Sequence, residues 1–192
     1  MARWQPDAQG RLQHAAMTLF LQRGYAAVTV AEIADRAGLT KRTFFNHFPD
    51  KREVLFAGAQ DFEAGIVKHL TEATDDLAPI DAAIAALTRS SLELAQYSDY
   101  ARIRRDLIAS SPELQERDLI KMTSLASAIA EALRHRHVPP RTATLTAQAA
   151  VTVFNTAYTD WIDNSTEDFT TLMQRSLTEF RQAVGATRGT GN

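Results

Sequence analysis

The chain has no cysteine and few residues that interrupt helices, with eight glycines and six prolines among its 192 residues. The absence of cysteine excludes disulfide bonds and thiol chemistry, and it is typical of proteins from a reducing compartment. No apolar run approaches the roughly 20 residues that a membrane-spanning helix needs, and the first residues lack the apolar core of a signal peptide. We therefore expect a cytoplasmic protein.

The sequence is instead rich in alanine and leucine, and its 45% hydrophobic content is enough for a real core. Beyond Glu53 it reads as successive amphipathic helices without strand-like alternation, so the expected fold class is all-α with about nine helices. The expected later helices begin with one at about 50–70, capped by Asp50, and one that starts at Pro79 and has Leu94 on its apolar face. Three more are expected at about 99–109, from a cap at 110–113 to about 136, and at about 141–163. A last one follows a capping box of Ser165 and Asp168 and ends near 184.

One segment, from Thr29 to Glu53, has the pattern of two short helices joined by a tight turn. Thr29 and Glu32 form a capping box, so the first of these helices starts near residue 30. Gly38 is the small residue that accepts a left-handed conformation where this helix must end. The segment therefore predicts a helix-turn-helix.

The second short helix, capped by Thr40, is expected at 41–48 and has one buried face. Phe44 and Phe48 are four residues apart and share that face. The side chains that fall away from it are Lys41, Arg42, Thr43, Phe45 and Asn46. A short helix with this outward face suits DNA, which requires cations for phosphates and both donors and apolar groups for base edges.

The start of this helix is the part of a recognition helix that reaches base edges, and Arg42 suits a bidentate contact with guanine. The predicted base contacts are Lys41, Arg42, Thr43 and Phe45. Thr29 and Lys51 lie at helix N-termini, where backbone amides attract anions, and they are predicted phosphate contacts. Helix capping alone also explains the two threonines, Thr29 and Thr40.

The charge distribution agrees with this prediction although the net charge of the chain is −2. Residues 1–56 hold eight Lys or Arg and five Asp or Glu, a balance of +3, and the remainder holds 13 and 18, a balance of −5. The positive part of the chain coincides with the helix-turn-helix.

The stretch from about Leu12 to Leu55 resembles the tetracycline-repressor (TetR) family of bacterial transcription regulators. The resemblance is carried by the RGY at 23–25, the IADRAGLT turn, the TFFNHF recognition helix and the FPDK that follows it. It implies a DNA-binding domain at 1–52, a helical ligand-binding and dimerisation domain at 53–185, and a disordered tail at 186–192.

By the same resemblance, further side chains match positions that contact phosphates in the family. These are Tyr25 and His47, and we add Asn46, where many members carry an aromatic residue instead.

The resemblance also implies that the last two helices pair with those of a second chain as a four-helix bundle. The apolar spacing of these helices allows this, because side chains of this kind must be buried, although the core of a single chain would also bury them. The predicted dimer contacts are Val153, Trp161, Phe169, Leu172, Leu177 and Phe180. A homodimer would read two half-sites of a palindrome about 34 Å apart, with twice the base contacts of one helix.

A small apolar or amphipathic effector is expected in the C-terminal domain, where binding would favour wrongly spaced reading heads and release DNA. A set of apolar residues could line the effector cavity or could be ordinary core. These are Phe62, Ile66, Leu94, Tyr97, Ile103, Leu107, Met122, Leu125, Phe154, Tyr158 and Trp161. Three arginines could either contact an anionic group of the ligand or face solvent: Arg102, Arg104 and Arg105. The stretch from 102 to 122 looks like the C-terminal domain of mycofactocin-regulator relatives, which implies acyl-CoA-like ligands.

Other function classes have less support in the sequence. His135 and His137 lack a third ligand nearby, so we expect no metal site, no cofactor and no enzyme activity. A helical protein-interaction module would explain the amphipathic body but not Lys41, Arg42 and Lys51. The prediction is a ligand-responsive repressor, with an activator of the same fold as the alternative.

Overall fold

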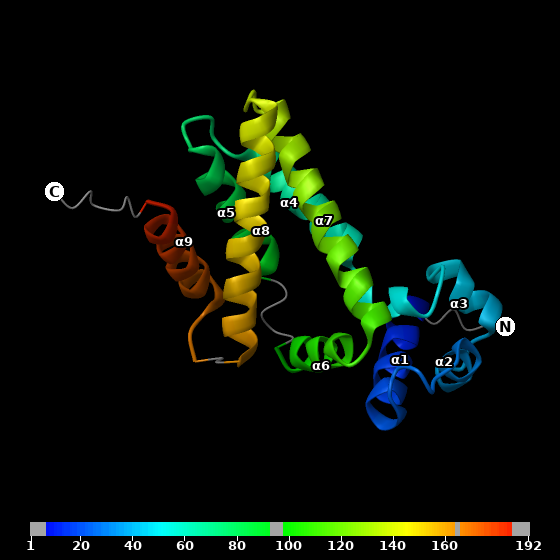
Figure 1. Ribbon diagram of the computed structural model, residues 1–192. Coiled ribbons are helices and arrows are strands. Elements are labelled where there is room, and N and C mark those ends of the chain that lie inside the picture. The colour runs from blue at the N-terminus through cyan, green and yellow to red at the C-terminus, as the bar shows by residue number, and fades with distance from the viewer. Residues whose placement is uncertain (1–6, 93–97, 164–165, 186–192) are drawn as a thin grey trace. The chain divides into compact units, whose positions relative to one another are not determined.

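The structure is a computed structural model that describes residues 7–92, 98–163 and 166–185. In these ranges it contains nine α-helices, one 3-10 helix and no strand, which confirms the expected all-α class. The elements, shown in Figure 1, are α1 (Ala8–Arg23), α2 (Val30–Arg36), α3 (Lys41–His47), η1 (Arg52–Phe56), α4 (Ala59–Glu72), α5 (Pro79–Ser91), α6 (Ser98–Ala109), α7 (Pro112–His135), α8 (Pro140–Asp163) and α9 (Phe169–Gly185).

The chain divides into two compact units. The first comprises Met1–Ala59 and Ile103–Ile120, and the second comprises Gln60–Arg102 and Lys121–Asn192. The first unit therefore includes the segments 53–59 and 103–120, which lie outside the DNA-binding domain expected at 1–52.

The first unit is built around the apolar faces of its short helices. Leu12 and Phe20 of α1, Ile33 of α2, Phe44 of α3 and Leu55 of η1 are each at most 1% exposed. Because α2 and α3 have only seven residues each, such helices depend on tertiary packing for their stability.

The structure corrects the single helix expected at about 50–70. The Asp50 carboxylate caps its start as expected, since Oδ1 accepts from the amides of Arg52 at 2.8 Å and Glu53 at 3.2 Å. However, the segment is a 3-10 turn, η1, which gives way to extended backbone at Ala57 before α4 begins at Ala59. Gly58 has φ +83° at this break, a conformation that glycine adopts without a steric penalty.

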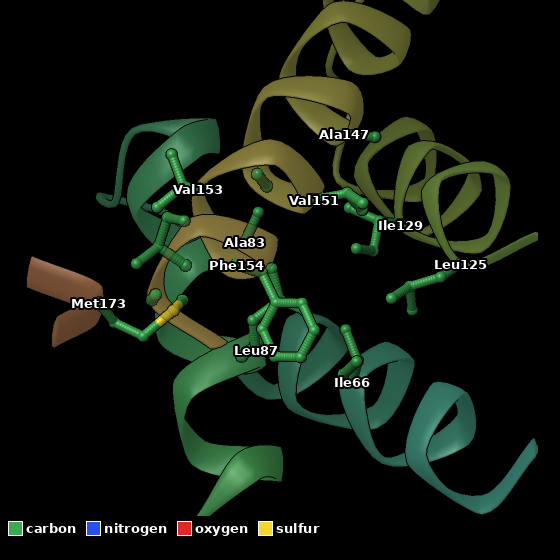
Figure 2. Packing of buried hydrophobic residues seen from close by; sticks show 14 of the residues in the cluster. Ile66, Ala83, Leu87, Leu125, Ile129, Ala147, Val151, Val153, Phe154 and Met173 are labelled. Atoms are coloured by element: carbon green, nitrogen blue, oxygen red, sulfur yellow. The ribbon is translucent and has the colours of Figure 1, made fainter. Parts of the chain in front are cut away.

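The second unit has a core formed by α4, α5, α7, α8 and α9, with Ala101 of α6. Figure 2 shows the ring of Phe154, from α8, between Leu87 of α5 and Ile66 of α4. Met173 of α9 and Ile129 of α7 complete the same cluster and are fully buried. These long helices therefore bury their apolar stripes within one chain.

Three boundary details complete the comparison with the expected helices. Helix α5 ends at Ser91, and Leu94, expected on its apolar face, lies outside the described residues. Ser165, expected in the cap of α9, is also outside them, as is the tail 186–192. Asp168 caps α9 directly, because its Oδ1 accepts from the Thr171 amide at 3.0 Å.

Two arginines close helix C-termini in the second unit, where the last carbonyl groups of a helix lack partners. Arg136 donates to the carbonyls of Leu70 at 3.1 Å, Ala73 at 2.6 Å and Thr74 at 2.7 Å, at the end of α4. Arg102 donates through Nη2 to the Ile162 carbonyl, at 2.9 Å, at the end of α8. Arg102 thus has a structural partner, in addition to the two roles that the sequence left open.

Candidate nucleic-acid interface

The turn between α2 and α3 has the hydrogen bonds that the sequence predicts for it. Thr29 Oγ1 accepts from the Glu32 amide at 3.3 Å, and the Glu32 carboxylate accepts from the Thr29 amide at 2.8 Å, which confirms the capping box. At the other end, the Leu39 amide donates to the Ala34 carbonyl at 2.8 Å around Gly38, whose φ is +65°. This left-handed closure fixes the direction in which α3 leaves the turn.

Helix α3 is anchored by its phenylalanines, as expected. Phe44 and Phe48 are at most 2% exposed, and their ring centroids are 5.5 Å apart. Phe45 is 55% exposed although its ring is apolar. An apolar side chain that remains in water on a cationic helix is suited to contact with a thymine methyl group.

The two cations at the start of α3 are exposed, and neither forms an ion pair or side-chain hydrogen bond within the described parts of the chain. Lys41 and Arg42 therefore keep their donors available for base edges or phosphates. Thr43 is half-buried, and its hydroxyl lies 2.9 Å from that of Thr40, so a base contact through oxygen would compete with this hydrogen bond. Asn46 and His47, predicted phosphate contacts, are exposed near the end of α3.

The phosphate contact predicted for Thr29 is occupied by a carboxylate in the free protein. Both the amide and the hydroxyl of Thr29 donate to Glu32 Oε2, each at 2.8 Å. Arg23 Nη1 lies 2.6 Å from Glu32 Oε1, and this hydrogen bond, with those of Thr29, lowers the pKa of Glu32 to about 2. To bind the Thr29 amide and hydroxyl, a DNA phosphate would have to displace the Glu32 carboxylate, which is also negatively charged.

Lys51 and Tyr25, which are also predicted phosphate contacts, already form hydrogen bonds within the protein. Lys51 Nζ donates to the carbonyls of Tyr25 and Val28, both at 2.9 Å, and lies 4.0 Å from the centroid of the Tyr25 ring. Burial lowers the pKa of Lys51, while the nearby Glu113 carboxylate opposes this shift. Two of the three ammonium protons hold the α1–α2 loop, which leaves one for DNA.

Tyr25 is only 5% exposed, and its hydroxyl lies 3.3 Å from Glu113 Oε1 on α7. Burial and the Glu113 carboxylate both raise the pKa of Tyr25. Glu113 also lies 3.5 Å from Arg52 Nε. The Tyr25 hydroxyl thus donates to a carboxylate, and a DNA phosphate would have to replace that acceptor.

Further residues from α6 and α7 support the helix-turn-helix, a role that the sequence did not predict for them. Arg117 of α7 pairs with Glu53 of η1. Arg104 of α6 donates to the Leu55 carbonyl at 2.9 Å and to Asp118 at 3.1 Å. These partners are 14 to 64 residues apart in the chain, so local spacing carried no signal of them.

The predicted effector-pocket residues do not all fall in one unit. Ile103 and Leu107 belong to the first unit, while Leu94 and Tyr97 lie outside the described residues. The other residues belong to the second unit: Ile66, Leu125, Phe154 and Trp161 are buried in its core, and Phe62, Met122 and Tyr158 pack against that core with part of their surface exposed.

The residues predicted as dimer contacts pack largely within the chain itself, so their role between two chains stays a prediction. Five are at most 6% exposed within the second unit: Val153, Trp161, Phe169, Leu172 and Leu177. Phe180 is half-buried. The apolar stripe that suggested a partner is the stripe that packs α8 and α9 against their own core.

The described residues offer no features of two other function classes, metal-dependent proteins and membrane-spanning proteins. They contain no group of three or more potential metal-ligating side chains. None of the described helices combines the length and apolar character needed to cross a membrane. The capped turn and the cationic outward face of α3 define a helix-turn-helix DNA-binding protein.

Comparison with known families identifies the class further. Residues 12–57 match the family of bacterial regulatory proteins of the tetR type, and residues 77–185 match the MftR C-terminal domain. The chain belongs to the TetR family of DNA-binding transcription regulators, with a C-terminal domain of the MftR type. This family consists of transcription regulators and not of enzymes.

Relatives of known name agree with this assignment. The transcriptional activator FasR of Mycolicibacterium smegmatis is 36% identical over 84 residues, which are 42% of this chain and 38% of FasR. The regulator CymR of Pseudomonas putida is 28% identical over 113 residues, 57% of this chain and 55% of CymR. The matched stretch thus spans 38% to 55% of the length of these two relatives.

Solved structures share the fold over almost the whole chain. The complex of SmeT with triclosan has a TM-score of 0.61 at 19% identity, and covers 92% of this chain and 90% of SmeT. FadR of Thermus thermophilus with lauroyl-CoA has a TM-score of 0.54 at 19% identity, and covers 96% and 98%. At this identity the likeness concerns the fold alone.

Proposed function

We propose that this TetR-family regulator is a repressor that binds a palindromic operator as a homodimer and is released by a small apolar or amphipathic effector. Residues 1–52 read the DNA, and residues 53–185 bind the effector and a second copy of the chain. The protein acts in the cytoplasm, where bacterial DNA is found.

The outward face of α3 is the observation that carries this proposal. Lys41, Arg42 and Phe45 are exposed on a helix whose opposite side is fixed by buried phenylalanines. Such a helix enters the major groove with its N-terminal end toward the base edges. Because one helix of this length reaches only a few base pairs, selection of a site in a genome requires two copies.

The exposed flank of α8 supports the homodimer. No charged residue lies between Thr142 and Thr159. The hydroxyls of the exposed Thr152, Thr156 and Thr159 donate to the carbonyls four residues earlier, at 2.9 to 3.1 Å, so these side chains need no external hydrogen-bond partner. Such a flank loses little on desolvation, and its position on α8 agrees with the two-chain bundle that the sequence suggested.

The partly buried rings of the second unit support the effector. The Phe154 ring centroid lies 5.8 Å from those of Phe62 and Tyr158, and the latter two side chains retain exposed surface. Aromatic side chains of this kind suit a ligand with an apolar body. The triclosan and lauroyl-CoA complexes of SmeT and FadR, which share the fold, provide two probes of this chemistry.

An activator of the same fold is the alternative, and FasR, whose name describes an activator, supports it. SmeT is the repressor of a Stenotrophomonas maltophilia efflux pump. The position of the operator relative to the promoter separates the two, because a repressor site overlaps the region that the polymerase occupies.

Selection of bound sites from a random duplex pool tests the DNA-reading proposal. We expect a palindrome, a complex with two chains per duplex, and release by triclosan or lauroyl-CoA. In the Arg42→Ala variant the preference at one position of each half-site should relax, with about 1–3 kcal/mol less discrimination. Arg89→Ala, which removes the same charge from an exposed site on α5, is the matched control and should leave the selected sequence unchanged.

Recovery of the same sequences by the Arg42→Ala variant would overturn the role of α3. A selected site without two-fold symmetry, or a complex with one chain, would overturn the homodimer and leave DNA reading intact. Neither probe needs to be the natural effector, so the effector proposal fails only if a panel of apolar and acyl-CoA compounds also leaves the complex unchanged.

A further inference from the structure

A depression of about 820 Å³ lies on the first unit, beside the turn between α2 and α3. It is lined by the start of α1, through Asp7, Arg11 and His14, and by the end of α2 and the turn, through Arg36 and Gly38. None of these residues was identified as a contact from the sequence. The depression therefore widens the candidate nucleic-acid interface beyond α3.

The lining of this depression carries excess positive charge. Asp7 is its one acid, and this carboxylate caps α1 by accepting from the Gly10 amide at 2.8 Å. The Arg11 guanidinium donates to the Ala37 carbonyl, at the end of α2. Arg11 of α1 and Arg36 of α2 thus line the depression, and the single carboxylate of Asp7, which caps α1, does not neutralise both charges.

Arg36 is the side chain most available to a ligand. It is exposed, and in the described ranges 7–92, 98–163 and 166–185 it forms no ion pair and no side-chain hydrogen bond. In contrast, Arg23 pairs with Glu32 at 2.6 Å, and Arg52 pairs with Asp50 at 2.7 Å. Among these arginines of the first unit, Arg36 keeps its whole fork of donors for an anion.

The position of the depression indicates which anion it receives. Gly38, which borders it, is three residues before Lys41, the first residue of α3. When the start of α3 enters a major groove, the turn before it faces the sugar-phosphate backbone at the edge of that groove, since the preceding helix of the motif crosses the backbone. A backbone phosphate would then meet the depression.

We propose that this depression binds a DNA backbone phosphate, with Arg36 as the contact and with Arg11 and His14 beside it. The inference rests on the proposed DNA-reading function and adds a contact outside α3. The guanidinium of Arg36 is suited to two parallel hydrogen bonds with phosphate oxygens. Such a contact fixes the register of the motif on the duplex without reading sequence.

The first test measures the salt dependence of binding to the selected palindrome and to a scrambled duplex. Each phosphate contact contributes about 0.9 to the slope of log K against log salt. Arg36→Gln should therefore lower the magnitude of the slope by about 0.9 per half-site on both duplexes, which is about a 3.5-fold change per half-site between about 50 and 200 mM salt. Arg36→Lys should retain the slope, and Arg89→Gln is the control for loss of one charge.

The second test locates the contact. Single phosphates of the palindrome are replaced by neutral methylphosphonates, and the affinities of the native protein and Arg36→Gln are compared at each position. A contact predicts one position per half-site where the native protein loses affinity and the variant does not, because each change removes the same interaction. A uniform effect at all positions would reflect net charge only and would overturn the proposal.

Three further outcomes are decisive. If the native protein binds its palindrome but the Arg36→Gln slope equals the native slope, the phosphate assignment is wrong while DNA reading stands. If inorganic phosphate binds the free protein in a manner that requires Arg36, and the methylphosphonate scan shows no position, the depression serves a free anion instead. Failure of the native protein to select any site would refute the proposed function itself, separately from this inference.

Discussion

Substitution of Gly38 offers a sharp test of how the helix-turn-helix is held together. The left-handed φ of +65° costs a residue with a side chain about 1–2 kcal/mol. A Cβ atom at this position would lie 3.0 Å from Arg11 Nη2, so the guanidinium, which donates to the Ala37 carbonyl, must move by a few tenths of an ångström. Disturbance of that hydrogen bond adds at most about 1 kcal/mol. The free energy of unfolding should therefore fall by about 1–3 kcal/mol in Gly38→Ala.

Gly38→Asn separates the two causes. Asparagine tolerates the left-handed region better than alanine, although it crowds Arg11 at least as much. If backbone conformation dominates, Gly38→Asn should be less destabilised than Gly38→Ala, as measured by urea unfolding followed by far-ultraviolet circular dichroism. A loss below about 0.5 kcal/mol in Gly38→Ala, or a larger loss for asparagine than for alanine, would refute this reasoning.

Three further perturbations concern the caps and ties described above. Arg136→Ala should lower the urea-unfolding free energy by about 2–3 kcal/mol, since three carbonyls at the end of α4 lose a charged donor; an unchanged midpoint would exclude this capping role. Glu32 has a pKa of about 2 in the folded protein, against an ordinary value of 4.5. Its contribution to stability is therefore present above pH 4.5 and is lost as the pH falls toward 2. The difference in thermal midpoint between native protein and Glu32→Gln should narrow over that window, and a constant difference would contradict the assignment. Lys51→Met keeps the aliphatic stem but loses two hydrogen bonds to carbonyls, and its unfolding free energy measured without DNA should fall by about 1–2 kcal/mol; native stability would show that the ammonium is free for phosphate.

The helix-turn-helix could be predicted closely because its signals are local. The capping box at Thr29, the left-handed Gly38 and the spacing of Phe44 and Phe48 each act within four residues of chain, and the structure confirms all three. The length of the helix after Asp50 could not be predicted in the same way. A single glycine is tolerated within a helical pattern, and only the structure shows that Gly58 has a φ of +83°.

The contacts that the sequence could not reveal are those between distant segments. Arg102 and Arg104 were open to a ligand or to solvent, but they donate to carbonyls 60 and 49 residues away. The apolar residues of α8 and α9 illustrate the same limit. Their spacing shows that they must be buried, but it does not distinguish burial in the chain's own core from burial against a partner.

Phe45 gives the recognition helix a thermodynamic consequence. Its ring is 55% exposed in the free protein, so water solvates an apolar surface at the centre of the cationic face. Docking against a thymine methyl group would remove that hydration, and removal of apolar surface from water lowers the heat capacity. Binding through phosphates alone would leave the ring hydrated. Calorimetry at several temperatures should therefore give a more negative heat-capacity change of binding for a duplex whose bases contact Phe45 than for one bound only through its phosphates.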